Sequence, residues 1–214
     1  MVRAAILPGK NEVTSPPSVA TSRTKEEETM QRTVNGGPAR PVIEGVEGLE
    51  KDPQTVTPEG ALIRELIDGV RVRSANTIPD ERGTICEMYN PAWGFTEEPL
   101  VYVYQTTIRP KQAKGWVVHF EQDDRLFFSW GHVKVVLYDA REGSPTHGNV
   151  NELFFGEQNR ALLRIPRGVF HALQNVGEAD CMFVNMPTKP YNHRDPDKYR
   201  LPLDTDEIPY AFRR

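Results

Sequence analysis

Residues 166–175 read Pro-Arg-Gly-Val-Phe-His-Ala-Leu-Gln-Asn, and this stretch decides how the rest of the chain is interpreted. Its proline and glycine form a tight turn that delivers His171 to the next strand. A second histidine, His119, ends the stretch Lys-Gly-Trp-Val-Val-His at residues 114–119. The sequence between the two histidines is rich in strand-forming residues. We therefore predict a small β-barrel whose lumen is an active site lined by His119 and His171.

Short apolar segments follow one another from Leu100 to Met186, separated by turn signals such as Gly131 and the Gly-Ser-Pro run at 143–145. This rhythm is typical of antiparallel sandwiches and jelly rolls. The predicted strands cover residues 115–120, 125–130, 132–139, 152–155, 161–165, 171–176 and 180–186. The fold class that we predict is mainly β, an antiparallel jelly-roll barrel.

The first 59 residues differ from the rest of the chain in composition. All three Trp, seven Tyr and nine Phe residues lie at Tyr89 or later. A segment without aromatic residues cannot bury enough apolar surface to offset the entropy of ordering it. We predict a mobile or extended polar tail over residues 1–59 and a domain over 60–214. A short helix is expected from Pro58 to Asp68, with Thr57 as its N-cap and Gly69 after its end.

Charge and cysteine content narrow the class of protein. The formal net charge of −4 gives no reason to expect nucleic acid as a partner. Cys86 and Cys181 stand far apart, which fits a reducing compartment better than a disulfide framework or a zinc site. The apolar run after Arg3 is too short for a secretory signal, and no later segment approaches a membrane-spanning length. We expect a cytoplasmic protein without membrane or nucleic-acid partners.

The pattern Pro-x-Gly-x-x-His-x-x-x-Asn that ends at residue 175 resembles the second signature of the cupin superfamily, small jelly-roll barrels that often carry a metal. The first cupin signature normally supplies a His-x-His pair and a glutamate, whereas this chain has His119 followed by Glu121. These two side chains share one face of a strand, so with His171 they form an alternative two-histidine, one-carboxylate metal site. A metal-dependent cupin oxygenase or isomerase is therefore one alternative function.

Four segments in order resemble a more specific group, the dTDP-4-dehydrorhamnose 3,5-epimerase family, which are cupin-like enzymes of deoxysugar biosynthesis. The resemblance covers roughly Ile78 to Tyr210. The segments are Asp-Glu-Arg-Gly-Thr-Ile-Cys-Glu at 80–87, Asp-Ala-Arg-Glu-Gly-Ser-Pro-Thr-His-Gly at 139–148, Ile-Pro-Arg-Gly-Val-Phe-His-Ala at 165–172 and Thr-Lys-Pro-Tyr at 188–191.

This resemblance implies an epimerase acting on a nucleoside-diphosphate 4-keto-6-deoxysugar, at one carbon or two, with no metal and no other cofactor. It also implies a homodimer that pairs through exchanged N-terminal strands. Arg82 is expected to meet a nucleotide phosphate across the dimer interface. Glu87, Gln122 and Asp139 are expected to be further substrate-binding residues.

The chemistry of epimerisation suggests a role for each remaining candidate. Inverting a carbon beside a ketone needs a base, groups that hold the enolate oxygen, and an acid on the opposite face. We assign His119 as the base, oriented by Asp204, because histidine titrates near neutrality. Tyr191 matches the family's catalytic tyrosine and is assigned as the acid. Arg125 and His171 are expected to stabilise the oxyanion.

The chain departs from the family near these residues. No Arg-Gly-x-His sequence precedes His119, and Arg125 stands where we align the family's lysine after a glutamine. The late Trp-x-Asp-Pro segment is reduced to Leu-Asp-Thr-Asp at 203–206. The displaced glycine and missing arginine beside His119 favour a second alternative, a non-catalytic sugar-nucleotide-binding barrel.

Overall fold

The computed structural model describes residues 48–60 and 62–212. The chain divides into two units, residues 1–53 and 54–214. The described part of the first unit, residues 48–53, is exposed and has no regular secondary structure. The predicted tail, 1–59, therefore lies largely outside the described residues, and its boundary near residue 60 stays a prediction.

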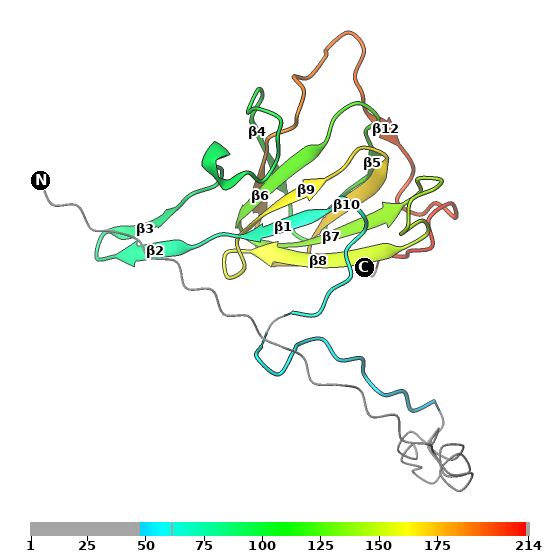
Figure 1. Cartoon of the computed structure of the whole chain (residues 1–214), viewed down its shortest axis with the longest axis horizontal. Coiled ribbons are helices and arrows are strands. Elements are labelled where there is room, and N and C mark those ends of the chain that lie inside the picture. Colours follow the sequence, from blue (N-terminus) through cyan, green and yellow to red (C-terminus); the bar gives the residue numbers. More distant parts are fainter. Residues whose placement is uncertain (1–47, 61, 213–214) are drawn as a thin grey trace, which may run out of the picture. The chain divides into compact units, whose positions relative to one another are not determined.

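Two antiparallel five-stranded sheets form the second unit (Figure 1). The first sheet contains, in spatial order, β1 (Arg71–Ser74), β9 (Ala161–Ile165), β6 (Asp124–Trp130), β11 (Cys181–Asn185) and β4 (Tyr104–Ile108). The second sheet contains β12 (Tyr199–Arg200), β5 (Ala113–Val118), β10 (Val169–Asn175), β7 (His132–Asp139) and β8 (Val150–Gly156). Neighbouring strands are mostly distant in sequence, as in a jelly roll. The predicted mainly β fold is confirmed.

The main hydrophobic core lies between the two sheets. Phe128 of β6 stacks on Phe155 of β8, with ring centroids 4.6 Å apart, so the inner faces of the sheets are in contact. Leu126, Val135 and Leu163 belong to the same cluster, and each is at most 1% exposed. Burying a side chain of this size contributes about 1.5–3 kcal/mol. The period-two alternation of the strands thus supplies one apolar face to a shared core.

Smaller clusters cover the outer faces of both sheets. Phe127 and Leu162 pack with Phe95 on the first sheet. On the second sheet, the C-terminal segment covers Trp116, whose ring meets Tyr210 edge to face at 6.1 Å. Because both faces of the central strands are covered, alternation alone does not say which face of a strand looks into a cavity.

The helix predicted from Pro58 to Asp68 is wrong: its described residues form turns, irregular backbone and an isolated bridge between Val56 and Leu62. The amide of Ile67 donates to Asn151 Oδ1 at 2.9 Å, and that of Asp68 donates to Thr146 Oγ1 at 2.9 Å. These bonds to distant side chains replace the bonds of a helix. Among the described residues, the one helix is the 3-10 helix η2 (Pro91–Trp93).

A hairpin of β2 (Thr77–Asp80) and β3 (Gly83–Cys86) extends away from the two sheets (Figure 1). Ile78 and Ile85 face each other across it, and each is 66% exposed. The hairpin therefore displays apolar side chains that residues 48–60 and 62–212 leave exposed. The described part of the chain contains no helix long and apolar enough to span a membrane.

Candidate active site

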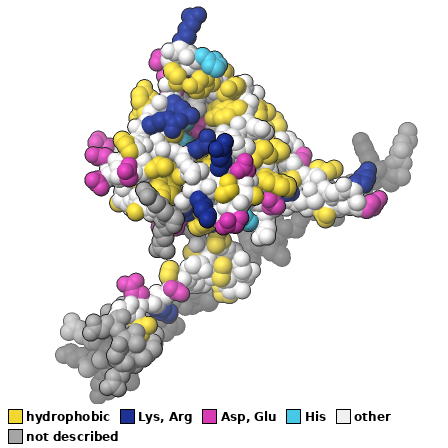
Figure 2. Space-filling model, turned by 180° about the vertical axis from the view of Figure 1, so that it is seen from behind, with side chains coloured by type: hydrophobic (Ala, Val, Ile, Leu, Met, Phe, Trp, Pro, Cys, Tyr) yellow, Lys and Arg dark blue, Asp and Glu magenta, His cyan; other side chains and the backbone are white. Residues whose placement is uncertain are grey.

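A cavity of about 360 Å³ opens between the sheets, lined by both. On the face shown in Figure 2, Lys and Arg side chains gather around a hollow. Three cationic residues line the cavity, Lys114, Lys198 and Arg200. Its polar lining also includes Tyr104, His119, Asp124, His171 and Asn185. The structure thus brings His119 and His171 together, as the sequence predicted.

His119 follows the end of β5 and is held by Asp197. Its Nδ1 atom faces the backbone oxygen of Asp197, and the Asp197 carboxylate accepts from the amides of Phe120 at 2.9 Å and Glu121 at 2.7 Å. A carbonyl oxygen only accepts, so Nδ1 carries the proton and Nε2 of the neutral ring carries the lone pair. Asp197 therefore fixes both the turn and the tautomer of His119.

Asp124, the first residue of β6, lies between the two histidines. Its Oδ2 atom is 3.5 Å from Nε2 of His119 and 3.4 Å from Nε2 of His171. Gln122 donates to the other oxygen at 3.1 Å. Burial by itself raises the pKa of Asp124, but the hydrogen bond and charge of His119 and the charge of His171 lower it to about 2. Asp124 is thus a buried carboxylate that is ionised at neutral pH.

The two histidines differ in pKa because burial outweighs the charge of Asp124 at only one of them. Burial lowers the pKa of His119, but the hydrogen bond and charge of Asp124 outweigh it, and the pKa is raised. Burial dominates at His171 and lowers its pKa to about 4. At neutral pH His171 is therefore neutral, whereas His119 is a stronger base than an ordinary histidine.

Asn185 links Asp124 to a tyrosine. Its side chain is 3% exposed, its amide nitrogen is 2.9 Å from the Tyr104 hydroxyl, and its hydrogen bond to Asp124 helps to lower the pKa of that carboxyl. Burial, with the charge of Asp124, raises the pKa of Tyr104 to about 12. Tyr104 is therefore a protonated phenol on the wall of the cavity.

Tyr191 lines a smaller space of about 100 Å³ next to the cavity, and His119, Tyr104 and Lys198 line both. Its side chain is 41% exposed, and its ring contacts His193 edge to face at 4.9 Å. Two tyrosines are thus near His119, of which the sequence predicted one.

The structure places Arg125 outside the cavity. Strand alternation turns Asp124 and Leu126 toward the cavity and Arg125 toward the opposite face. The Arg125 guanidinium is fully buried and donates to the backbone oxygens of Met186, Glu98, Pro99 and Pro187 and to Thr96 Oγ1. It ties two loops together and cannot reach an oxyanion at His119.

Asp139 is also away from the cavity. Its buried carboxylate accepts from Arg141 at 2.8 Å, from Ser144 at 2.6 Å and from Thr146 at 2.6 Å. Burial raises its pKa, but these donors, Arg141 first, outweigh burial and hold the pKa well below its usual range. Asp139 therefore organises the turn at 139–148.

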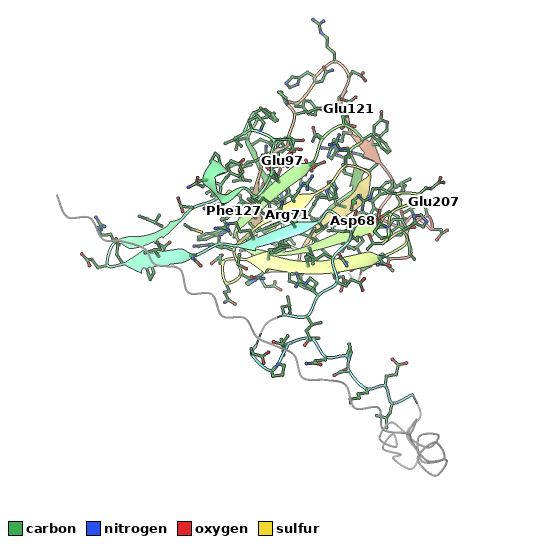
Figure 3. All side chains as sticks on the ribbon, viewed as in Figure 1. Asp68, Arg71, Glu97, Glu121, Phe127 and Glu207 are labelled. Atoms are coloured by element: carbon green, nitrogen blue, oxygen red, sulfur yellow. The ribbon has the colours of Figure 1, made fainter. Side chains whose placement is uncertain are left out.

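The remaining predicted residues do not line this cavity. Arg82 lies in the hairpin turn, pairs with Asp80 at 2.6 Å and has an 81% exposed side chain. Glu87 is exposed and lines a separate pocket beside Trp93. Asp204 is exposed, and the ring of His119 is held by Asp197 instead. Glu121, which is labelled in Figure 3, pairs at 3.0 Å with Lys189, so its carboxylate is not part of the buried cluster.

Sequence reasoning missed Asp124, Asp197, Tyr104, Asn185 and Lys198. Two of them had a signal. Asp124 follows Gln122 by two residues and directly precedes Arg125, the residue to which the sequence analysis gave the role. Asp197 follows the Asp-Pro pair at 195–196, which matches the Asp-Pro of the family's late segment better than residues 203–206 do.

The jelly-roll fold and the buried histidines and carboxylate define a cupin-like enzyme. The sequence profile described as "dTDP-4-dehydrorhamnose 3,5-epimerase" matches residues 64–207. The chain belongs to the dTDP-4-dehydrorhamnose 3,5-epimerase family, whose members are sugar-nucleotide epimerases.

Individual relatives agree with this assignment. The chain is 35% identical over 147 residues to the spore coat polysaccharide biosynthesis protein SpsL of Bacillus subtilis (strain 168), covering 69% of this chain and 97% of SpsL. It is 34% identical over 139 residues to the probable low-salt glycan biosynthesis epimerase Agl13 of Haloferax volcanii, covering 64% of this chain and 89% of Agl13. The dTDP sugar isomerase of Desulfovibrio desulfuricans G20 superposes with a TM-score of 0.64 at 27% identity, covering 68% of this chain and 91% of the isomerase.

Proposed function

We propose that this chain epimerises a dTDP-linked 4-keto-6-deoxysugar, with His119 as the base that removes the proton beside the ketone. The observation that carries this proposal is the placement of His119 Nε2 in the cavity, 3.5 Å from the Asp124 carboxylate. The backbone oxygen of Asp197 leaves this nitrogen as the one free to accept a proton. Family membership supports the substrate class.

Asp124 makes the proton transfer more favourable. When His119 accepts the proton, it becomes an imidazolium beside a carboxylate that is 3% exposed. In this poorly solvated place the pair is stabilised more than it would be in water. Gln122 and Asn185 hold the carboxylate in position. A well-placed general base contributes about 10²- to 10⁴-fold to the rate.

The enolate oxygen needs a cation, and Lys198 is the group that we assign. It lines the cavity together with His119 and His171. Burial and the nearby charge of Arg200 lower its pKa, although Asp124 opposes them. His171, with Nδ1 facing the backbone oxygen of Val169, presents a lone pair and not a proton at Nε2. Lys198 therefore replaces Arg125 in the role that the sequence gave it.

Tyr191 is the proposed acid, which returns a proton on the face opposite the base. Tyr191 and His119 line the same small space, which supports a role for both in proton transfer to one sugar. Lys114 and Arg200, on the same cavity, fit the diphosphate of the substrate. Their positive charges account for an anionic substrate without any contribution from Arg82 of the same chain.

Solvent-proton exchange tests this function. The protein is incubated with dTDP-4-keto-6-deoxyglucose in deuterium oxide, and the sugar signals are followed by NMR. We expect deuterium to enter beside the ketone, and the labelled carbons to show whether one centre or two is inverted. His119→Gln should abolish the exchange. His132→Gln, at the first residue of β7 and outside the cavity, should not. Absence of exchange in wild type would refute the proposal for this sugar.

We further propose a homodimer in which the β2–β3 hairpin packs on a second copy. The exposed Ile78 and Ile85 support this, and Arg82 at the tip of the hairpin would then serve the partner's cavity. Light scattering should give twice the 24.3 kDa chain mass for wild type. Ile78→Asp should give monomers; a monomeric wild type would contradict the proposal.

We also propose a cytoplasmic location, which the two free cysteines, Cys86 and Cys181, support.

A further inference from the structure

Ligand atoms from His119, Asp124 and His171 converge on one point. They lie within 4.8 Å of one another, and each residue is at most 8% exposed. Two histidines and one carboxylate form a donor set that divalent first-row metals favour. The carboxylate is Asp124, and not the Glu121 that the sequence suggested.

The ring hydrogen bonds prepare both histidines to act as ligands. Nδ1 of His119 faces the backbone oxygen of Asp197, and Nδ1 of His171 faces that of Val169 at 3.4 Å. Each Nδ1 therefore carries the proton, and each Nε2 directs a lone pair toward Asp124 Oδ2. Metal-bound histidines are almost always oriented by such a bond at the other ring nitrogen. Three electron-rich atoms that face one another favour a positive charge between them, which either a proton on His119 or a bound cation supplies.

The distances fit two ligands of one metal ion and are long for the hydrogen bond that protonated His119 makes to Asp124. The separations from Asp124 Oδ2 are 3.5 Å to His119 and 3.4 Å to His171. A charge-assisted hydrogen bond spans about 2.7–2.9 Å. In tetrahedral coordination with metal–ligand distances of about 2.1 Å, two ligand atoms lie about 3.4 Å apart.

We propose that His119, Asp124 and His171 bind one late first-row divalent cation, such as Zn²⁺ or Co²⁺, with a further coordination position open to the cavity. This site goes beyond the proposed epimerisation, which needs no metal. The cation would occupy the lone pair with which His119 removes a proton. Metal binding and proton abstraction at this nitrogen therefore exclude each other, and the metal acts as an inhibitor of the epimerase.

The test is a Co²⁺ titration of chelator-treated full-length protein, without any sugar nucleotide. We expect one equivalent to bind, with the intense visible absorption of four-coordinate Co²⁺. Asp124→Asn and His171→Gln should each weaken binding by at least about 100-fold, since even the loss of an outer partner costs 10–100-fold. Glu121→Gln, which removes the carboxylate outside the cluster, should bind as wild type does. Circular dichroism verifies that the variants fold.

A second measurement uses only the wild-type protein, so its result does not depend on whether the variants fold. In ¹⁵N NMR of the histidine rings, Zn²⁺ should shift Nε2 of His119 and His171 and leave His132, His147 and His193 unchanged. Absence of stoichiometric binding, shifts at the three other histidines, or full binding by Asp124→Asn would each overturn the proposal. Because no substrate is present, a failed metal site leaves the epimerase proposal intact, and failed turnover leaves the metal result intact.

Discussion

The cavity and the turn at 139–148 each contain a buried aspartate, but they use it differently. Asp139 is surrounded by donors that keep their protons: Arg141, Ser144 and Thr146. Asp124 faces two histidines, of which His119 can lose or gain a proton near neutral pH, whereas His171 does so only in acid. A buried carboxylate among fixed donors stabilises the fold, whereas one among titratable partners tunes their chemistry. The partners, and not the burial, distinguish a structural carboxylate from a functional one.

The largest expected effect is on activity, and it concerns the cavity that contains Asp124. His119→Gln keeps a polar side chain of similar size but removes the base, so kcat should fall by about 10²- to 10⁴-fold. Product formation followed by NMR measures the loss. Thermal unfolding should remain close to wild type. A variant with normal turnover would remove His119 from the mechanism.

The next prediction concerns the stability of the fold, to which the buried Arg125 contributes. Arg125→Met leaves several buried carbonyl oxygens without donors, and the protein should lose at least about 3 kcal/mol of unfolding free energy. Urea denaturation measures the change. Lys198→Met is the matched control, which should unfold like wild type but lose turnover. If Arg125→Met were stable and inactive instead, Arg125 would have the oxyanion role that the sequence suggested.

Asp139→Asn should weaken the fold by about 1.5–3 kcal/mol, because hydrogen bonds to a charged acceptor become neutral ones. The folded pKa of Asp139 is lowered, so the stability from its ionised form is present above the unfolded pKa of about 3.9 and is lost as pH falls toward the folded value. The difference between wild type and variant in chemical denaturation should therefore shrink in strong acid. Asp124→Asn should instead reduce turnover more than stability.

The smallest effect is expected at Glu121. Its ion pair with Lys189 joins two side chains that are 66% and 52% exposed. Such surface pairs contribute about 0–1 kcal/mol. Glu121→Gln should therefore change the midpoint of thermal unfolding little and leave turnover unchanged. A large loss of activity would mean that this carboxylate reaches the substrate.

Much of the fold and part of the site were readable from the sequence. Alternating strands and turn signals predicted the jelly roll, and the turn before His171 predicted its place in the lumen. The helix at 58–68 failed because its pattern is amphipathic, while distant side chains on the turn and strand after Asp139 take up its amides. Local propensity cannot anticipate such bonds.

The central carboxylate was missed for a geometric reason. Side chains alternate in direction along a strand, but the irregular turn between β5 and β6 interrupts this alternation. The direction of His119 therefore does not predict the direction of Asp124. A choice that is wrong by one residue then moves the side chain from the cavity to the opposite face, as happened with Arg125. The loop that contains Asp197 has no periodicity at all, and Asp204 was chosen in its place.

The most direct test of the His119–Asp124 pair is the pH dependence of solvent-proton exchange, measured in chelator for wild type and Asp124→Asn. The base must be unprotonated, so exchange by wild type should rise with pH through an apparent pKa above the ordinary histidine value of about 6.5. Removing the Asp124 charge lowers the pKa of His119, and the acidic limb should move to lower pH while the maximal rate falls. An acidic limb at the same pH in both proteins would contradict the pairing.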